Sequence, residues 1–292
     1  MNKIKLIIVM MLWGSIGLFT RYIPLSSIQL AFCRSVIALP ILITLVPNKK
    51  GLLKLDKTSV FLYAISGALI ALAWVALFYG YKHTTIASAV IVYNMCPVYV
   101  MLLAPFVLKE KGRITQTIVI GVAFLGLILI VGNSSENSGS MSGLLMSGVS
   151  GILYAIIVLM NRKMSVKLES NTATFIQMCA ASLVLLPFII NQGLVENLVS
   201  LDMRALVLTI ILGVVHTGIA YNLYFSTYHH MKSIDIVVFS YLEPVFGILL
   251  SLVILGESLS IAQWLGALLI LGSTFVGEIF KQTNFKKQKV KA

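Results

Sequence analysis

The sequence is dominated by long apolar runs of about twenty residues, separated by short stretches that hold most of the charged and turn-forming residues. Such a run has the length of a transmembrane helix, and in hydrocarbon a helix bonds all of its own backbone polar groups. The chain is 59% apolar and only 11% charged, whereas soluble domains are about a quarter charged. These features exclude a soluble enzyme and predict an all-α polytopic membrane protein.

Ten apolar runs fit into the 292 residues with short connections, which leaves no room for a large domain outside the membrane. The first run follows Lys3 and Lys5 as in a signal peptide, but no alanine precedes Ala31 to form a cleavage site, so we expect it to be retained. The expected transmembrane helices cover approximately residues 4–22, 28–46, 58–81, 85–107, 114–132, 142–160, 171–191, 205–228, 234–256 and 260–280.

The basic residues indicate how these helices are oriented. Of the 22 Lys and Arg residues, 18 fall at the N-terminus, in alternate loops and at the C-terminus, three fall on the opposite side, and Arg34 lies within a span. Cytoplasmic loops carry the excess of positive charge. The sequence therefore predicts a multi-pass protein of the cell membrane with both termini in the cytoplasm. Because the basic residues alternate with apolar runs, the net charge of +12 predicts contact with membrane lipid and no nucleic-acid partner.

The two halves of the chain resemble each other when one is shifted by 147 residues. Residues 78–116 and 225–263 share 12 of 39 positions without a gap, including aligned Pro, Glu, Gln and His residues. We expect a first repeat over 1–132, an extracytoplasmic linker over 133–141, a second repeat over 142–280 and a basic cytoplasmic tail over 281–292. Since each repeat has five spans, the second is inverted, as in secondary transporters that alternate between two open states.

Two prolines at matching repeat positions, Pro97 and Pro244, lie near the middle of the fourth and ninth spans. A proline inside a helix removes one hydrogen bond and clashes with the preceding turn. Paired interruptions of this kind are the best sequence indication of a binding site at the membrane midplane. The alternative is that both prolines are ordinary kinks that aid packing.

Glu243 precedes the second of these prolines and lies near the centre of its span, where a charge is costly unless it is paired, protonated or hydrated. It either serves a solute or proton pathway, or is a structural acid paired with Arg34 or His216. Arg34 either extends to an interface or lines the cavity. The candidate substrate-binding or coupling residues are Trp13, Trp74, Tyr93, Asn94, His216, Tyr221, Asn222, Tyr241 and Glu243.

Motifs for other chemistries are absent from the sequence. It has no phosphate-binding GxxxxGK[ST] loop, no HExxH and no GxGxxG, so we expect no nucleotide cofactor, no metal site and no enzymatic activity. One alternative is an intramembrane serine protease, since Gly148-Val149-Ser150-Gly151 matches GxSG and His216 could act as the base for Ser150. A membrane scaffold without transport activity is another.

Short motifs in both halves resemble those of the drug/metabolite transporter superfamily, specifically its ten-helix EamA-type members. The resemblance covers essentially the whole chain. The first half departs from the pattern, with Cys96 at the position that matches Glu243 and Lys109 at the position that matches Gly256. The motifs are Leu12-Trp13-Gly14, Phe32-Cys33-Arg34 and Glu110, then Leu242-Glu243-Pro244, Leu255-Gly256-Glu257 and Gln263-Trp264-Leu265-Gly266-Ala267.

The resemblance implies two inverted five-helix repeats around a central cavity, with the fifth and tenth helices at the periphery. It also implies transport of small solutes, often outward, among them amino acids, nucleotide-related metabolites, sugars and drugs. The aromatic and neutral polar candidates suit a small amphipathic solute, such as an amino acid or an amine drawn to Glu243. We therefore expect a secondary transporter of a small-molecule solute, with protons as a candidate coupling ion.

Overall fold

The computed structural model describes residues 2–47, 49, 52, 55–109, 114–132, 140–163, 168–190, 192–228, 231 and 233–291, and no strand occurs in these ranges. Glu110 and most of the expected linker, residues 133–139, therefore lie outside the described residues. The elements are α1 (Asn2–Tyr22), α2 (Ser27–Leu45), α3 (Lys57–His83), α4 (Ile86–Tyr93), α5 (Cys96–Leu108), α6 (Ile114–Gly132), α7 (Met141–Lys163), α8 (Ser170–Ile190), α9 (Leu194–Val199), α10 (Met203–Gly213), the π-helix η3 (Val214–Ile219), α11 (Ala220–Tyr228), α12 (Ser233–Ser240), α13 (Leu242–Ile254) and α14 (Ile261–Lys291).

These helices account for the ten expected spans within the described part of the chain. Eight stretches are long and apolar enough to cross a membrane, and two shorter apolar stretches, Val238–Ile254 and Ile261–Gly277, supply the others. The fourth, eighth and ninth spans are each divided into two or three helical pieces. The sequence did not indicate the short helix α9, and α14 continues through residues 281–291 of the expected basic tail.

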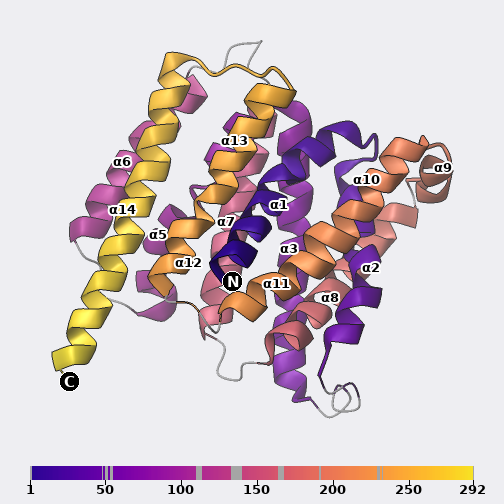
Figure 1. Ribbon diagram of the computed structural model, residues 1–292, viewed down its shortest axis with the longest axis horizontal. Helices are drawn as coiled ribbons and strands as arrows, with labels where there is room; N and C mark the ends of the chain where they lie inside the picture. Colours follow the sequence, from indigo (N-terminus) through magenta and orange to yellow (C-terminus); the bar gives the residue numbers. More distant parts are fainter. Residues whose placement is uncertain are drawn as a thin grey trace.

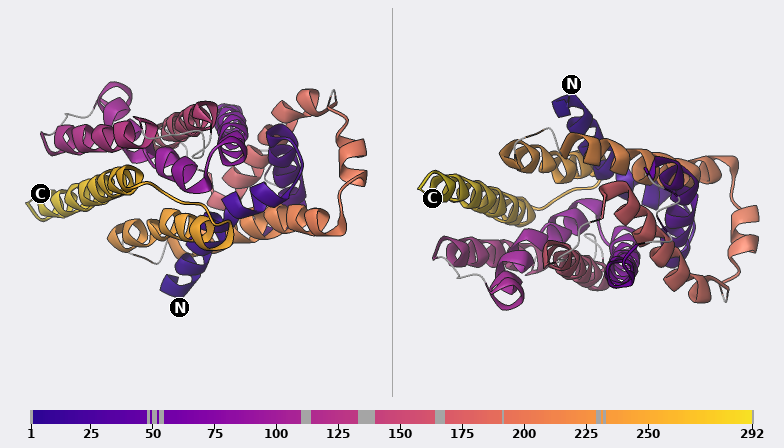
Figure 2. Two further views of the ribbon diagram at one scale, coloured as in Figure 1. Left: turned by 90° about the horizontal axis from the view of Figure 1, so that it is seen from above. Right: turned by 90° about the horizontal axis from the view of Figure 1, so that it is seen from below.

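The helices pair as an inverted repeat requires (Figures 1 and 2). The first span of the first half, α1, packs on α13 of the ninth span. The first span of the second half, α7, packs on α4 and α5, which form the fourth span. The matching fifth and tenth spans, α6 and α14, pack against each other along the left edge of Figure 1. Seen from above, α5, α6 and α7 form one row and α10 to α13 form the other (Figure 2). The architecture is thus a bundle of two interlocked halves.

The repeat also appears in the backbone conformation at the ends of α5 and α13. Lys109 ends α5 with φ of 54°, and Gly256 follows α13 with φ of 65°. These two residues occupy equivalent positions in the repeat. Glycine adopts this left-handed conformation without cost, whereas a residue with a Cβ is disfavoured there. Lys109 therefore adopts the same left-handed backbone conformation in the first half that Gly256 adopts in the second half.

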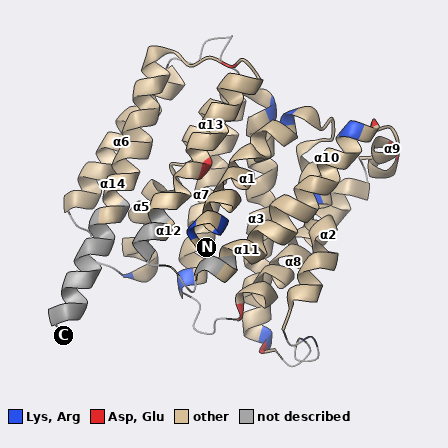
Figure 3. Cartoon of the chain, viewed as in Figure 1, with Lys and Arg blue, Asp and Glu red and all other residues tan. Residues whose placement is uncertain are grey.

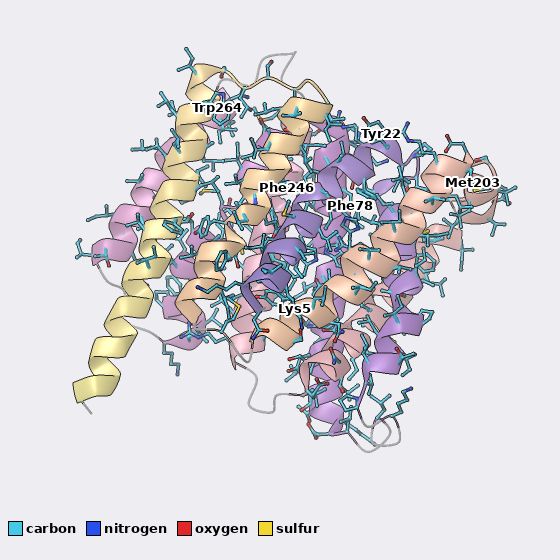
Figure 4. The ribbon with its side chains drawn as sticks, in the orientation of Figure 1. Lys5, Tyr22, Phe78, Met203, Phe246 and Trp264 are labelled. Carbon is cyan, nitrogen blue, oxygen red and sulfur yellow. The ribbon has the colours of Figure 1, made fainter. Side chains whose placement is uncertain are left out.

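Within the described residues, most charged positions lie toward the two ends of the bundle, and few lie in its middle (Figure 3). The outer faces are apolar: Met203 is 73% exposed, and the side chain of Trp264 also projects outward (Figure 4). Phe78, by contrast, is fully buried in the centre of the bundle. An apolar exterior around a packed interior is what contact with lipid requires.

Small residues let α6 and α14 approach closely, as in other membrane helix pairs. A Cβ added at Gly126 would lie 2.7 Å from the carbonyl oxygen of Gly266, and one added at Gly266 would lie 2.6 Å from that of Gly126. Gly121, on the same helix, has nothing within 4 Å of such a Cβ. The two positions therefore differ in packing while sharing a helix.

We predict that Gly126→Ala lowers the thermal stability of the purified protein, because the added methyl group forces the two backbones apart at a cost of about 1–3 kcal/mol. Gly121→Ala is the matched control, and it should leave the melting temperature unchanged or raise it, since alanine favours a helix. Thermal unfolding in detergent measures both. Equal melting temperatures for the two variants would contradict the close α6–α14 contact.

Candidate functional site

Both proline positions coincide with real interruptions of their spans. α4 ends at Tyr93 and α5 begins at Cys96, so Pro97 occupies the first turn of α5, where a missing N–H costs nothing. α12 ends at Ser240 and α13 begins at Leu242, which places Pro244 in the same way. Each proline thus lies in the first turn of the helix that follows an interruption of its span.

A glycine of a neighbouring helix lies against the backbone at each break. A Cβ at Gly14 of α1 would be 2.6 Å from the carbonyl oxygen of Glu243, and one at Gly151 of α7 would be 2.9 Å from that of Tyr93. Unbonded backbone is tolerated at membrane depth only where protein or water surrounds it. Here α1 and α7 cover the interrupted backbone closely.

His216 is fixed by residues of α1. It lies in the π-helix η3, and helices of this kind are frequent at functional sites. The indole Nε1 of Trp13 donates to the His216 carbonyl at 3.0 Å, and the Ser15 hydroxyl lies 2.9 Å from Nε2 of the imidazole. Trp13 also packs against the rings of Tyr221 and Tyr224, with centroids 5.3 Å and 5.2 Å away. These candidates from α1, η3 and α11 form one cluster.

Arg34 points into the bundle and is only 4% exposed. Its Nε donates to the Thr217 hydroxyl at 2.7 Å, and its guanidinium lies 4.0 Å from the centroid of the Trp74 ring. Stacking of this type stabilises a desolvated cation. The sequence left open whether Arg34 extends to an interface, and the structure places it in the interior instead.

The Glu243 side chain is half-buried beside the break between α12 and α13. It interacts electrostatically with Arg34 and with four tyrosines from four other elements, namely Tyr81, Tyr93, Tyr154 and Tyr221. Among the described residues its carboxyl group has no hydrogen bond and no ion pair. The alternative of a structural acid paired with Arg34 or His216 is not seen among the described contacts, where the one ion pair joins Arg21 and Glu257.

Three further predicted residues lie at the two helix breaks and in α11. Tyr241 packs against Phe275 of α14, with ring centroids 5.1 Å apart. The side chain of Asn94 donates to the carbonyl of Val90 in its own helix at 2.8 Å, and Asn222 is half-buried in α11. The local hydrogen bond of Asn94 gives it a role in ending α4.

Sequence reasoning missed several residues of the site. Ser15, Thr217 and Tyr154 hold or surround the predicted ones. Thr217 could have been noticed because it follows His216 directly, and Tyr154 because it lies deep in its span. Ser15 carries no signal of its own, since a serine in a membrane helix usually bonds to the preceding turn.

The residues of the protease alternative are not paired. The hydroxyl of Ser150 donates to the carbonyl of Ala73 at 2.8 Å, which ties α7 to α3. The imidazole of His216 bonds to Ser15. In the described ranges, no group of three or more His, Cys, Asp or Glu residues could hold a metal ion. The geometry thus gives Ser150 a packing role.

Several known proteins are similar to this chain over most of its length. An uncharacterized transporter of Bacillus subtilis, YxxF, is 29% identical over 272 residues, which cover 91% of this chain and 86% of that protein. A Salmonella typhimurium protein named as a probable amino-acid metabolite efflux pump is 25% identical over 186 residues, or 61% of this chain and 62% of that protein. A crystal structure with a TM-score of 0.64 and 17% identity covers 96% of both chains and shares the fold.

A family model also matches both halves of the chain. The EamA-like transporter family matches residues 3–132 and, separately, residues 141–277. These two matches correspond to α1–α6 and to the region from α7 into α14. The chain belongs to the EamA-like transporter family.

Proposed function

We propose that the protein is a secondary transporter that exports small metabolites, namely amino acids, amines or drug-like solutes, by alternating access. The observation that carries this proposal is the pair of opposite charges, Arg34 and Glu243, held inside the membrane region beside a break in the ninth span. Charges at such depth are rare and mark solute or ion pathways. The name of the Salmonella relative supports outward movement of amino-acid metabolites.

The aromatic side chains around these charges support a small amphipathic solute. Trp74 covers one face of Arg34, and Tyr93, Tyr154 and Tyr221 interact electrostatically with Glu243. Rings of this kind bind apolar groups and also attract cations through their faces. In this proposal Glu243 either binds the solute directly or carries the coupling proton.

The distribution of Lys and Arg supports a location in the cell membrane with both termini in the cytoplasm. The ends of α1, α3 and α13 then lie at the outer surface. There the carboxylate of Glu257 accepts hydrogen bonds from Arg21 at 3.1 Å and from the backbone N–H groups of Ile86 and Ala87 at 3.0 and 3.3 Å. Arg21 also donates to the carbonyl of Thr84 at 2.8 Å.

We propose that this cluster of Arg21, Glu257 and the start of α4 is the latch that keeps the outer side closed in the described conformation. It joins α1, α4 and the connection between α13 and α14. Negative charge at a helix N-terminus is favourable, and charged hydrogen bonds are stronger than neutral ones. Opening to the outside separates these elements and breaks the latch.

We predict that Glu257→Gln raises the rate at which a membrane-impermeant thiol reagent, added to intact cells, modifies Asn94→Cys in a background without the native cysteines. Loss of the charged hydrogen bonds should favour the outward-open state by about tenfold, which corresponds to about 1.4 kcal/mol. The matched control is Glu169→Gln, since Glu169 accepts hydrogen bonds from Asn171 and Thr172 at the start of α8. Equal labelling rates in the Asn94→Cys background, with Glu257→Gln and with Glu169→Gln would show that the cluster does not keep the outer side closed.

We predict that Glu243→Gln, which is nearly isosteric but neutral, reduces transport by at least about tenfold while the amount of folded protein stays unchanged. Cells that express the protein should tolerate toxic amino-acid analogues or amines, and cells with the variant should not. Membrane abundance is measured in parallel. Full protection by the variant, or its loss from the membrane, would support a structural role for Glu243.

Response to a pH gradient separates the two roles of this carboxyl group. If Glu243 carries the coupling proton, flux through Glu243→Gln no longer responds to an imposed gradient. If it holds the solute, the response remains and the apparent KM for amine-bearing solutes rises. Glu196→Gln is a suitable control, because Glu196 lies in the short helix α9 outside the site.

A further inference from the structure

The guanidinium of Arg34 has hydrogen-bonding capacity that the described residues do not use. An arginine side chain offers five N–H donors in a fixed plane, and of these only the Nε donor has a partner here, the Thr217 hydroxyl at 2.7 Å. The remaining donors are on the two Nη atoms, in a side chain that is 4% exposed. The Nη atoms are not among the fully buried side-chain atoms that lack a hydrogen-bond partner, so these N–H groups are open to a ligand that accepts hydrogen bonds.

The orientation of these donors is fixed by the protein. The Thr217 hydroxyl donates to the carbonyl of Leu212 at 3.2 Å, which leaves its lone pair for Arg34. Trp74 lies against the guanidinium, with 4.0 Å between Cζ and the ring centroid. With one edge held by Thr217 and one face held by Trp74, the Nη edge is preorganised. A planar fork of this kind matches a carboxylate, which binds to it through two parallel hydrogen bonds.

Glu243 supplies the complementary half of the site. Its carboxyl group attracts Arg34 electrostatically, yet the one ion pair among the described residues joins Arg21 and Glu257. A solute with a carboxylate and an ammonium group a few atoms apart would satisfy both groups at once. A simple amine would satisfy Glu243 and leave the cation of Arg34 unpaired in the interior, which is unfavourable.

We propose that Arg34 is the carboxylate-binding residue of the transport site, and that the site takes a zwitterionic amino-acid-type solute with its ammonium group toward Glu243. This inference rests on the proposed transport function and narrows its substrate class. Tyr93, Tyr154 and Tyr221 all interact electrostatically with Glu243, and aromatic rings near the ammonium end would favour a cation and an apolar side chain. Amines and carboxylic acids that lack the second charged group are poor ligands of this site.

The test measures binding to the purified full-length protein with two series of compounds, one with a benzyl and one with an isobutyl side chain. Each series contains the amino acid (phenylalanine or leucine), its amide, the amine without the carboxylate and the acid without the amine. In the wild type, an amino acid should bind at least about tenfold more tightly than its amide, amine or acid. Arg34→Gln should weaken binding of the amino acid by about 10- to 100-fold and leave the affinity for the amine unchanged or higher.

Glu243→Gln should have the opposite selectivity: it removes the preference for the amino acid over the acid and keeps the preference over the amide. Thr217→Val keeps the charge of Arg34 but releases its Nε, so it should weaken amino-acid binding less than Arg34→Gln does. Arg204→Gln is the matched control, because Arg204 also lies over an aromatic ring, that of Tyr22 at 4.8 Å, but is exposed. It should bind every compound as the wild type does.

Three results would overturn the inference. They are binding of an amine or amide as tight as that of the amino acid, an equal loss for all four compounds in Arg34→Gln, and binding of no amino acid by the wild type. If Arg34→Gln does not fold, Thr217→Val and Arg34→Lys provide the same comparison. Transport of amines without amino acids would refute this inference and leave the transport function intact, whereas the absence of flux for every solute would refute the transport function itself.

Discussion

Hydrocarbon offers no hydrogen-bond partner to a peptide group, and this constraint determines most of the structure. It makes each apolar run a helix and keeps loops at the two ends of the bundle. An interruption inside the membrane must therefore be covered by protein, as Gly14 and Gly151 allow at the two breaks. The interrupted spans and the closely packed glycines therefore belong together. The interruptions expose backbone polar groups inside the membrane, and the glycines let neighbouring helices cover those groups.

The same constraint gives meaning to the interior charges. A buried arginine is unfavourable unless it is stacked and hydrogen-bonded, and Arg34 is held by Trp74 and Thr217. Glu243 has no such support within the described residues, although Arg34 attracts it. Stability alone would favour apolar residues at both positions. Their presence beside a helix break favours a pathway that needs both charges, which is the basis for a site selective for zwitterions.

The sequence was sufficient to predict the ten spans, because length and hydropathy act locally. It could not predict how each helix is rotated, since a helix that is apolar on all sides carries no periodic signal. Tyr241 therefore faces Phe275, although its neighbour Glu243 interacts with Arg34. The π-helix at His216 was also unpredictable, because its partners Trp13 and Ser15 lie about two hundred residues earlier in the chain. Such long-range contacts leave no local pattern.

In the proposed function, this chain alone moves a small zwitterionic solute across a membrane by alternating access. Counterflow in vesicles that contain only the purified protein tests it most directly. Vesicles loaded with unlabelled phenylalanine or leucine and diluted into a trace of the same labelled solute should accumulate label transiently, without any ion gradient. Vesicles without protein should not. Label uptake no greater than in protein-free vesicles, for every amino acid tested, would contradict the account.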